Sequence, residues 1–486
     1  MIATTLLLTS ASIVPSNAYE QISATELDRR LTPQLEQAVA VHELPGLAVA
    51  IVGGGETIYM RGFGTAERGT ERAVTAKSIF HMASVSKPFV ATAIMTLVEA
   101  GKLELDDTVV KHLPYFRLAD ERAREITIRQ VLQHRSGMPD VSDYEWDKPQ
   151  HDEGAAERFV RSLTDEQLLY APGTSGRYSN MAFDVMGDLI AKVSGESFED
   201  YVEQTILKPL GMTTTSFIHS RTPEEHRTRG HSNYYSSRID NYPSPHYPYN
   251  RRHAPSSTLN SNLEDMCRWL QFNLYRGSDQ AKRPLSQTSF DQLFGVSSAD
   301  GAGLSWMVDS SGGPTTIQHS GGDVGFSANV YMVPELKLGI VLMGNCDATP
   351  IGALTALCLG AVEGRSVNMP PPGIGLPFAR ILEADGVDAA IDSYGQLREH
   401  PTIRYRYGFD ELDRVGHTLL RQERFEDAVA VMGFNMMEYM DSVDGLVSLA
   451  QALQGMGETG EARALLEQAL EMNPKHGDAR DLLQGL

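Results

Sequence analysis

The sequence predicts an α+β protein with an antiparallel sheet and an all-α C-terminal tail. Strand-like segments with short connections fill residues 302–345, and short connections favour antiparallel neighbours. Helical patterns with long loops dominate residues 111–290. A Pro- and Gly-rich linker at 366–376 then leads to a tail, residues 377–486, in which helical patterns repeat.

The composition is that of a globular protein with no affinity for polyanions. Of its 486 residues, 41% are hydrophobic and 22% are charged, and a chain of this size can bury a sizeable core. The formal net charge of -21 repels nucleic acid and anionic membranes, so neither is an expected partner. Cys267, Cys346 and Cys358 lack zinc or redox spacing. We expect buried thiols there, and the sequence leaves a disulfide open.

The first 18 residues, MIATTLLLTSASIVPSNA, are apolar and small and end in a small-x-small cleavage pattern. This run is too short to span a bilayer, and no later stretch approaches a transmembrane span. We expect a secretory signal, and therefore a periplasmic or secreted protein. The alternative is a poorly ordered N-terminus, since no Lys or Arg precedes Arg29.

The segments up to residue 110 predict a helix, a hairpin and a second helix. Residues 22–42 have a helical pattern, and GLAVAIVGGGETIYMRGFGTAE predicts two strands around a Gly turn. The three glycines lack Walker spacing and a following Lys, which argues against a phosphate loop. Residues 85–100 predict an amphipathic helix with Pro88 in its first turn and Gly101 as its C-cap.

Two loops between residues 141 and 255 are expected to shape a binding pocket. The stretch HSNYYSSRIDNYPSPHYPYNRRHAP is rich in Tyr, Pro and Asn, which disfavours a helix or a central strand. Loops 141–158 and 221–255 either line a site or are plain surface excursions. The histidines within or beside them have no metal-ligand spacing and are expected to decorate loops: His219, His226, His231, His246 and His253.

The segment from 302 to 365 predicts a meander followed by a helix. GLSWMV, TTIQHSG, GFSANVYMVP and KLGIVLMGN alternate with turns, and PIGALTALCLGAVEG has a helical pattern. Trp306 is expected in the core or in a cleft wall.

The tail repeats with a period of 34 residues. Ala428 and Ala462 are separated by this offset, and so are Leu412 and Leu446. The period and pattern resemble tetratricopeptide repeats. Two interpretations have equal weight: a surface for a protein partner or self-association, and a stabilising helical appendage.

Ser84 and Lys87 form the only Ser-x-x-Lys of the chain, at a predicted helix start. Residues i and i+3 share a helix face, so Lys87 can reach the Ser84 hydroxyl, and the helix N-terminus offers N–H groups to an oxyanion. A serine needs a base, and lysine can serve only when burial or a neighbouring cation keeps it neutral. Alone, the pair equally fits an N-cap and a surface charge.

Two further motifs change that balance. YSN, with Tyr178 and Asn180, precedes another amphipathic helix, and HSG, beginning at His319, ends a probable strand. S-x-x-K, Y-x-N and H-x-G follow the order of the penicillin-recognising serine hydrolases. Over roughly residues 25–365, including GKLELDDTVVKHLP and ITIRQVLQHRSGMPD, the chain resembles the superfamily of class C β-lactamases and D-alanyl-D-alanine carboxypeptidases, with its esterase and D-aminopeptidase relatives.

The resemblance implies a β-lactamase/transpeptidase-like architecture for residues 22–365. An antiparallel sheet flanked by helices would draw on both ends of this domain. A mainly helical domain, about residues 111–290, would be inserted between them. The active site would lie in the cleft between sheet and insertion. The tail from 377 is outside the resemblance.

The resemblance also implies roles for individual residues. Ser84 would be the acylated nucleophile, and Lys87 and Tyr178 would handle its proton. A charged Lys87 would lower the pKa of Tyr178 and make a phenolate base accessible, whereas a neutral Lys87 would itself be the base; the sequence leaves both open. Backbone N–H groups of Ser84 and Gly322 would form the oxyanion hole. The implied substrate-binding residues are Asn180, His319, Ser320, Gly321 and Gly322.

The third motif departs from class C β-lactamases, where it begins with Lys. His319 is largely neutral near pH 7, so it holds a carboxylate less well. We therefore expect a serine hydrolase that forms an acyl-enzyme with amides or esters, with D-amino-acid peptides or small carboxylic esters favoured. The alternatives are a β-lactamase and a non-catalytic penicillin-binding-like scaffold that uses the tail for partners. No cofactor or metal is expected.

Other polar residues near the motifs are expected to be structural. His134 in LQHRSGMPD predicts a structural hydrogen bond rather than catalysis. Asp106 and Asp107 in LELDD predict a capped or braced turn.

Overall fold

The computed structural model describes residues 22–232, 242–276, 284–296, 301–474 and 476–486. The predicted signal segment, residues 1–18, lies outside them. The chain divides into two compact units. The first comprises Met1–Ala40, Leu44–Gly230 and Pro245–Met369, and the second comprises Val41–Glu43, His231–Ser244 and Pro370–Leu486.

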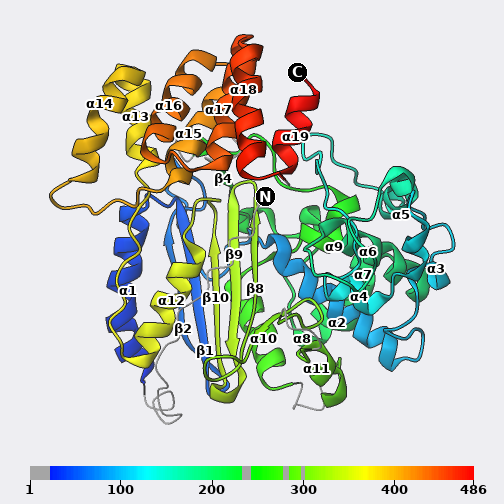
Figure 1. Cartoon of the computed structure of the whole chain (residues 1–486). Helices are drawn as coiled ribbons and strands as arrows, with labels where there is room; N and C mark the ends of the chain where they lie inside the picture. The colour runs from blue at the N-terminus through cyan, green and yellow to red at the C-terminus, as the bar shows by residue number, and fades with distance from the viewer. Residues whose placement is uncertain (1–21, 233–241, 277–283, 297–300, 475) are drawn as a thin grey trace. The chain divides into compact units, whose positions relative to one another are not determined.

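The first unit contains a six-stranded sheet in the order β2-β1-β10-β9-β8-β7 (Figure 1). Every neighbouring pair is antiparallel. The strands are β1 (Gly46–Gly53), β2 (Glu56–Gly64), β7 (Met307–Asp309), β8 (Thr316–Asp323), β9 (Phe326–Val333) and β10 (Leu338–Gly344). The predicted meander and hairpin are therefore confirmed, and the pairing of β1 with β10 joins the two ends of this region.

The central strands β1, β9 and β10 are buried on both faces because their side chains alternate between two cores. Leu47, Val49 and Ile51 of β1 pack with α1 (Ala24–Val41) and α12 (Ile351–Glu363). The intervening Ala48, Ala50 and Val52 pack with α2 (Ser86–Glu99) and α10 (Leu263–Leu274). Figure 1 shows α1 and α12 along the strands. A strand covered on both faces needs the continuous apolar run that β1 has.

The segment between β2 and β7 is mostly helical. Besides α2 and α10 it contains α3 (Val109–His112), α4 (Ile128–Leu132), α5 (Ala155–Ser162), α6 (Asn180–Ser194), α7 (Phe198–Val202), α8 (Lys208–Leu210), α9 (Ala254–Ser257) and α11 (Gln287–Leu293). One short ladder accompanies them, β3 (Phe80–His81) with β6 (Asn260–Ser261). A second, β4 (His231–Ser232) with β5 (Tyr242–Pro243), belongs to the second unit.

The second unit is built from consecutive helices. They are α13 (Gly375–Asp385), α14 (Val387–Arg398), α15 (Phe409–Arg421), α16 (Phe425–Glu438), α17 (Val443–Met456), α18 (Thr459–Met472) and α19 (Gly477–Gln484). The 34-residue offset relates α15 to α17 and α16 to α18, and its marker residues Leu412, Leu446, Ala428 and Ala462 are buried. The predicted linker, residues 366–376, overlaps the first two residues of α13, which begins at Gly375. Pro377 lies in its first turn, where a missing N–H costs no helical hydrogen bond.

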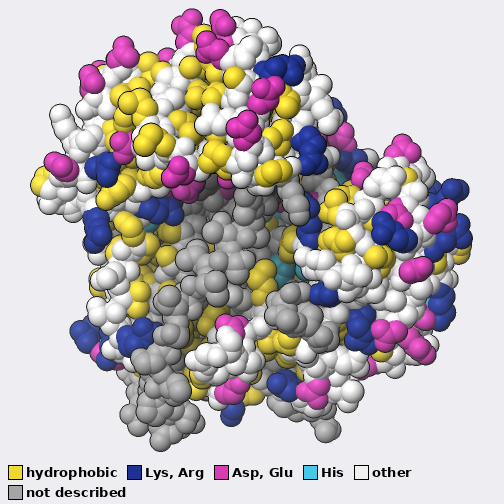
Figure 2. Space-filling view, in the orientation of Figure 1, with side chains coloured by type: hydrophobic (Ala, Val, Ile, Leu, Met, Phe, Trp, Pro, Cys, Tyr) yellow, Lys and Arg dark blue, Asp and Glu magenta, His cyan; other side chains and the backbone are white. Residues whose placement is uncertain are grey.

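The tail helices also expose apolar side chains. Figure 2 shows hydrophobic side chains gathered over this unit. Met437 and Met440 are 73% and 75% exposed, and Tyr407, Met456 and Met472 are more than 40% exposed. Among the described residues, no helix is long and apolar enough to cross a membrane.

Candidate active site

Ser84 lies in a short turn of helix, Ala83–Val85, directly before α2. Ala83 has a φ of 48°, in the left-handed region that residues with a side chain rarely adopt. Such a conformation costs roughly 1–2 kcal/mol and is kept where the surrounding structure enforces it. This turn leaves Ser84 partly exposed, while its neighbours Ala83 and Val85 are buried.

Lys87 is fully buried and points its amine at Ser84. Its Nζ donates to Ser84 Oγ at 3.0 Å and to the backbone oxygen of Ser256 at 2.8 Å, and it lies 4.8 Å from the centre of the Tyr178 ring. Burial lowers the pKa of Lys87 to about 7, against the opposing charges of Asp184, Asp140 and Asp323. The amine is therefore substantially neutral near neutral pH.

Tyr178 stands just before α6, against the amine of Lys87. Its ring stacks on His134, with centroids 4.2 Å apart and an interplanar angle of 25°. Burial raises the pKa of Tyr178, and its hydrogen bond with Ser84 only partly offsets this rise. The sequence-based idea of a lowered Tyr178 pKa is therefore wrong: burial disfavours the phenolate more than nearby groups favour it.

Asn180 is the first residue of α6, and its amide is held by an aspartate that the sequence did not identify. Ser179 caps the helix by accepting from the N–H of Ala182. Asp140 accepts from the backbone N–H of Asn180 at 2.7 Å and from its Nδ2 at 3.1 Å. Asp140 ends the stretch HRSGMPD, and nothing in its spacing to Asn180 signals this contact.

The H-S-G-G stretch runs along β8 beside the Ser84 turn. His319 is buried, and its Nδ1 donates to the Ser320 backbone oxygen at 2.7 Å. Burial lowers the pKa of His319 to about 3, so the ring is neutral near pH 7. Its centroid is 6.4 Å from that of Tyr178. Strand alternation leaves Ser320 and Gly322 exposed.

At Gly321, strand β8 lies against the turn that carries Ser84. A Cβ built on Gly321 would stand 2.3 Å from the Met82 backbone oxygen and 2.9 Å from the Ser84 nitrogen. Only glycine permits this approach. The structure thus brings together Ser84, Lys87, Tyr178, His319 and Gly321. Asn180 follows Tyr178 by two residues, and Ser320 and Gly322 flank Gly321 on β8, so their part in the site stays a prediction.

Three side chains that the sequence did not identify also lie around the site: Asp323, Asp184 and His253. Asp323 accepts from Ser257 Oγ at 2.5 Å and lies 3.3 Å from His81 Nε2. Asp184 and His253 form a fully buried pair, with 2.6 Å between Oδ2 and Nδ1. The expectation that His231 and His253 decorate loops is therefore wrong, since both are fully buried. Long-range pairing leaves no local sequence signal.

The loop 141–158 contributes aromatic side chains beside this buried pair. Tyr144 and Trp146 stack with centroids 4.8 Å apart, and both rings meet His253 edge-on. The charges of Asp140, Asp184 and Asp323 act on Tyr144, which places it near the site. Part of loop 221–255, residues 233–241, lies outside the described residues.

The remaining polar predictions concern structural roles. His134 accepts from the Ser179 N–H through Nδ1 at 3.2 Å, as expected of a structural histidine. Asp107 accepts from the Glu104 N–H and from His112, and Asp106 pairs with Arg129, so both brace this turn. Trp306 lies in the core, and Cys267, Cys346 and Cys358 are buried and form no disulfide with one another. Within the described ranges, no group of three or more His, Cys, Asp or Glu side chains could hold a metal.

Comparisons with known proteins place most of the first unit in a known family. The family model described as Beta-lactamase matches residues 31–356. Protein flp of Staphylococcus aureus (strain N315) is 27% identical over 329 residues, which are 67% of this chain and 64% of that protein. Esterase EstB of Burkholderia gladioli is 32% identical over 239 residues, covering 45% of this chain and 57% of EstB. The chain thus spans less than two thirds of these relatives.

Two solved structures have the same fold. The octameric penicillin-binding protein homologue from Pyrococcus abyssi has a TM-score of 0.60 at 23% identity, covering 74% of this chain and 81% of that one. D-alanine carboxypeptidase AmpC from Burkholderia cenocepacia has a TM-score of 0.58 at 23% identity, covering 70% of this chain and 99% of that one. At such identity, the likeness concerns the fold alone.

Proposed function

The chain belongs to the Beta-lactamase family, and from this premise we propose that it is a serine hydrolase that forms an acyl-enzyme with amides or esters. The observation that carries the proposal is the distance of 3.0 Å between Lys87 Nζ and Ser84 Oγ, across which a neutral amine can accept the hydroxyl proton. The pKa of Lys87, about 7, suits a base that works near neutral pH. A serine becomes a useful nucleophile when such a base takes its proton.

In the acylation step, neutral Lys87 takes the Ser84 proton while Oγ attacks the substrate carbonyl carbon. The carbonyl electron pair moves onto oxygen, where the backbone N–H groups of Ser84 and Gly322 stabilise the negative charge. When the carbonyl re-forms, the bond to the leaving group breaks. Tyr178 donates its phenolic proton to that group and is reprotonated from Lys87. Water then takes the place of the leaving group. Its oxygen attacks the acyl carbon while its proton passes to neutral Lys87, and Lys87 returns a proton to Ser84 Oγ as the bond between Oγ and the acyl carbon breaks.

Lys87 is preferred to Tyr178 as the base because burial favours the neutral amine of Lys87, which can accept a proton, and disfavours the phenolate of Tyr178. Burial lowers the pKa of Lys87 to about 7, so its reactive form is abundant. Burial raises the pKa of Tyr178, so its phenolate is rare and its phenol is a proton donor. Asn180, held by Asp140, would meet the substrate amide or ester group.

We propose D-amino-acid peptides and small carboxylic esters as the favoured substrates. A neutral His319 offers no cation to a substrate carboxylate, and Asp140 and Asp323 add negative charge near Lys87. This setting disfavours penicillin-like substrates, which carry a carboxylate, and ranks β-lactam hydrolysis below ester or amide hydrolysis. The relative EstB is named an esterase, and one structural neighbour is titled a D-alanine carboxypeptidase.

Covalent labelling tests the proposed nucleophile. Wild-type protein treated with a fluorophosphonate should gain one adduct by intact mass, and Ser84→Ala should gain none. Ser86→Ala is the matched control, because Ser86 lies two residues away but its hydroxyl is buried and bonds the Leu259 N–H. It should still label. A folded wild type that resists both a fluorophosphonate and a fluorescent penicillin would refute the hydrolase.

A substrate panel then tests the ranking. It would compare p-nitrophenyl esters, D-alanyl peptides with free and blocked termini, and nitrocefin by kcat/KM. Esters or D-amino-acid peptides should lead. Nitrocefin as the best substrate would establish the β-lactamase alternative instead.

We also propose that residues 1–18 direct export and that the tail binds a protein partner or a second copy of the chain. The apolar leading run supports the first, and the exposed Met437 and Met440 support the second. Intact mass of protein recovered from a bacterial periplasm tests export: loss of residues 1–18 is expected, and retention of the full N-terminus in the cytoplasm contradicts it.

A further inference from the structure

A buried carboxylate stands one helical turn beyond Asn180. Asp184 follows Asn180 by four residues in α6, so both lie on the helix face that meets the site. Asp184 has no exposed surface. Its Oδ2 lies 2.6 Å from His253 Nδ1, and its Oδ1 accepts from the backbone N–H of Ser256 at 3.2 Å. The carboxylate thus holds the residue before the short helix α9 and a residue within that helix.

The contacts of His253 fix its tautomer. Arg252 Nε can only donate, and it donates to His253 Nε2 at 2.9 Å. Nδ1 therefore carries the ring proton and donates it to Asp184. Arg252 is itself paired with Glu145 at 2.5 Å. The His253 ring is further enclosed by Tyr144, Trp146 and Phe159 at centroid distances of 5.0, 6.1 and 5.0 Å.

Helix α9 carries the atom that receives Lys87. The backbone oxygen of Ser256 accepts from Lys87 Nζ at 2.8 Å. A Cβ at Gly187 would stand 2.2 Å from Pro255 Cγ, so a glycine on α6 allows α9 to approach closely. A chain of direct contacts therefore leads from His253 through Asp184 and Ser256 to Lys87.

We propose that Asp184 and His253 are positioning residues, which hold the Ser256 carbonyl against Lys87 and so fix how the amine meets Ser84. The inference rests on the proposed function for its chemistry. Neither residue touches the reacting atoms, so neither is catalytic. A neutral lysine amine has two N–H donors and one lone pair on a flexible stem. The Ser256 carbonyl holds one N–H and so limits the rotation that would turn the amine away from Ser84.

Asp184 also acts on Lys87 through the negative charge of its carboxylate. The groups that face Lys87 are Asp184 on α6, Asp140 in the preceding loop, Asp323 on β8, and the rings of Tyr178, His134 and His319. Asp184 is the strongest of the three carboxylates that raise the pKa of Lys87 against burial. Loss of its charge should lower that pKa further.

The test is the rate of fluorophosphonate labelling of Ser84, measured from about pH 5 to about pH 9. The acid limb is the range in which this rate rises with pH to a plateau, and its midpoint reports the pKa of the base. Asp184→Asn keeps the shape of the side chain but removes its charge. We expect the acid limb to move to lower pH by about one unit and the plateau rate to fall about tenfold or more. His253→Leu should lower the plateau, and His253→Gln should retain more of it, because glutamine can still donate to Asp184.

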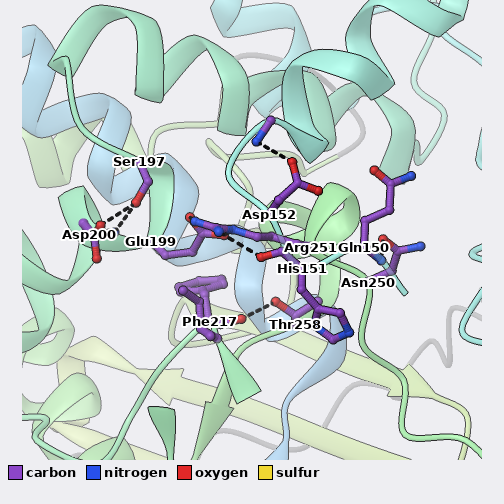
Figure 3. A network of polar contacts seen from close by, with 12 residues as sticks. Gln150, His151, Asp152, Ser197, Glu199, Asp200, Phe217, Asn250, Arg251 and Thr258 are labelled. Carbon is purple, nitrogen blue, oxygen red and sulfur yellow. Dashed lines mark hydrogen bonds and ion pairs between the residues drawn. The ribbon is translucent and has the colours of Figure 1, made fainter. Parts of the chain in front are cut away.

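Glu199→Gln is the matched control, because Glu199 on α7 holds Arg251 of the segment that carries His253 (Figure 3). Glu199 pairs with Arg251 at 2.8 Å, and both side chains are almost fully buried. Arg251 precedes His253 by two residues. Loss of this ion pair should lower Tm without moving the acid limb of the labelling rate. Gly187→Ala pushes Pro255 away without changing any charge, so it should lower the plateau and leave the limb in place.

The results separate the two proposals. Labelling of the wild type with an unchanged limb and plateau in Asp184→Asn overturns the positioning role alone. An equal limb shift in Glu199→Gln also overturns it, because the effect would then follow any buried lesion. If Asp184→Asn does not fold, Gly187→Ala decides, and a wild-type plateau there overturns the inference. No labelling of the wild type overturns the proposed function together with this inference.

Discussion

Gly321 lies so close to Ser84 that a Cβ at position 321 would stand 2.9 Å from the Ser84 backbone nitrogen. The same atom would stand 2.3 Å from the Met82 oxygen, and backbone cannot move aside as a side-chain tip can. The glycine of H-S-G therefore sets the distance between β8 and the Ser84 turn. Since Gly322 follows it directly, the same contact sets the separation of the two proposed oxyanion donors.

Gly321→Ala should consequently lower kcat for ester hydrolysis about a hundredfold, because one displaced oxyanion donor costs this much. KM should change far less than kcat. Gly352→Ala on α12 is the control, since a Cβ there meets nothing within 4 Å and alanine is the better helix former. Wild-type kcat in Gly321→Ala would contradict the role given to this contact.

The buried amine of Lys87 makes stability depend on pH. Its pKa is about 7 in the folded protein and near 10.5 when exposed. Below about pH 7 both states bind the proton, and the cost of burying the charge is fully present. Between these values only the unfolded state binds it, so stability rises with pH by about 1.4 kcal/mol per unit.

Lys87→Met should remove that dependence. Measured by urea unfolding, the stability of the wild type relative to Lys87→Met should rise from about pH 7 to about pH 9 by roughly 2–3 kcal/mol. Labelling of Ser84 should fall at least about a thousandfold in the variant. Parallel stability curves for the two proteins would show that Lys87 does not titrate in this range.

The sequence predicted the site's motif residues because each motif is short. Ser84 and Lys87 are three residues apart on a helix start, and H-S-G lies on one strand, so local spacing identifies them. The resemblance supplied what spacing could not, namely that YSN belongs to the same site. In the fold, the resemblance implied that one sheet draws on both ends of residues 22–365, but the pairing of β1 with β10 came only from the structure, since hydrophobic runs do not identify their partners.

The supporting residues could not be predicted in this way. Asp184 and His253 are 69 residues apart, and their bond depends on how α6 and α9 pack. His253 stands among Tyr, Pro and Arg in a loop-like stretch, which led to the wrong prediction of an exposed ring. The direction of the Tyr178 pKa was missed for the same reason, because burial is a tertiary property.

Tyr178→Phe distinguishes the two candidate bases. With Lys87 as the base, the variant should lose about a hundredfold in kcat, typical of a lost proton donor, and keep the acid limb near pH 7. With Tyr178 phenolate as the base, that limb would disappear together with nearly all labelling. Steady-state hydrolysis of a p-nitrophenyl ester across pH measures kcat and the position of the acid limb, and fluorophosphonate labelling is followed in parallel.

The exposed methionines of the tail predict a concentration-dependent assembly. Met437 and Met440 place two large apolar side chains in water at 73% and 75% exposure, close together at the end of α16. If they join copies of the chain, Met437→Lys with Met440→Lys should shift the mass by light scattering toward the monomer. The control is Glu471→Lys, an acidic position on α18. A wild-type monomer at all concentrations would contradict self-association.

His319→Lys should move selectivity toward substrates that carry a carboxylate. The wild-type ring is neutral because burial lowers its pKa to about 3, so it contributes no charge to binding. A lysine amine at this position would offer a cation beside Tyr178, at the cost of burying that charge. We expect the ratio of penicillin acylation to ester hydrolysis to rise about tenfold, equivalent to about 1.4 kcal/mol. His319→Gln, which keeps a neutral polar group, should leave the ratio near its wild-type value. An equal rise in both variants would show that pocket shape, rather than charge at residue 319, controls the acyl group that Ser84 accepts.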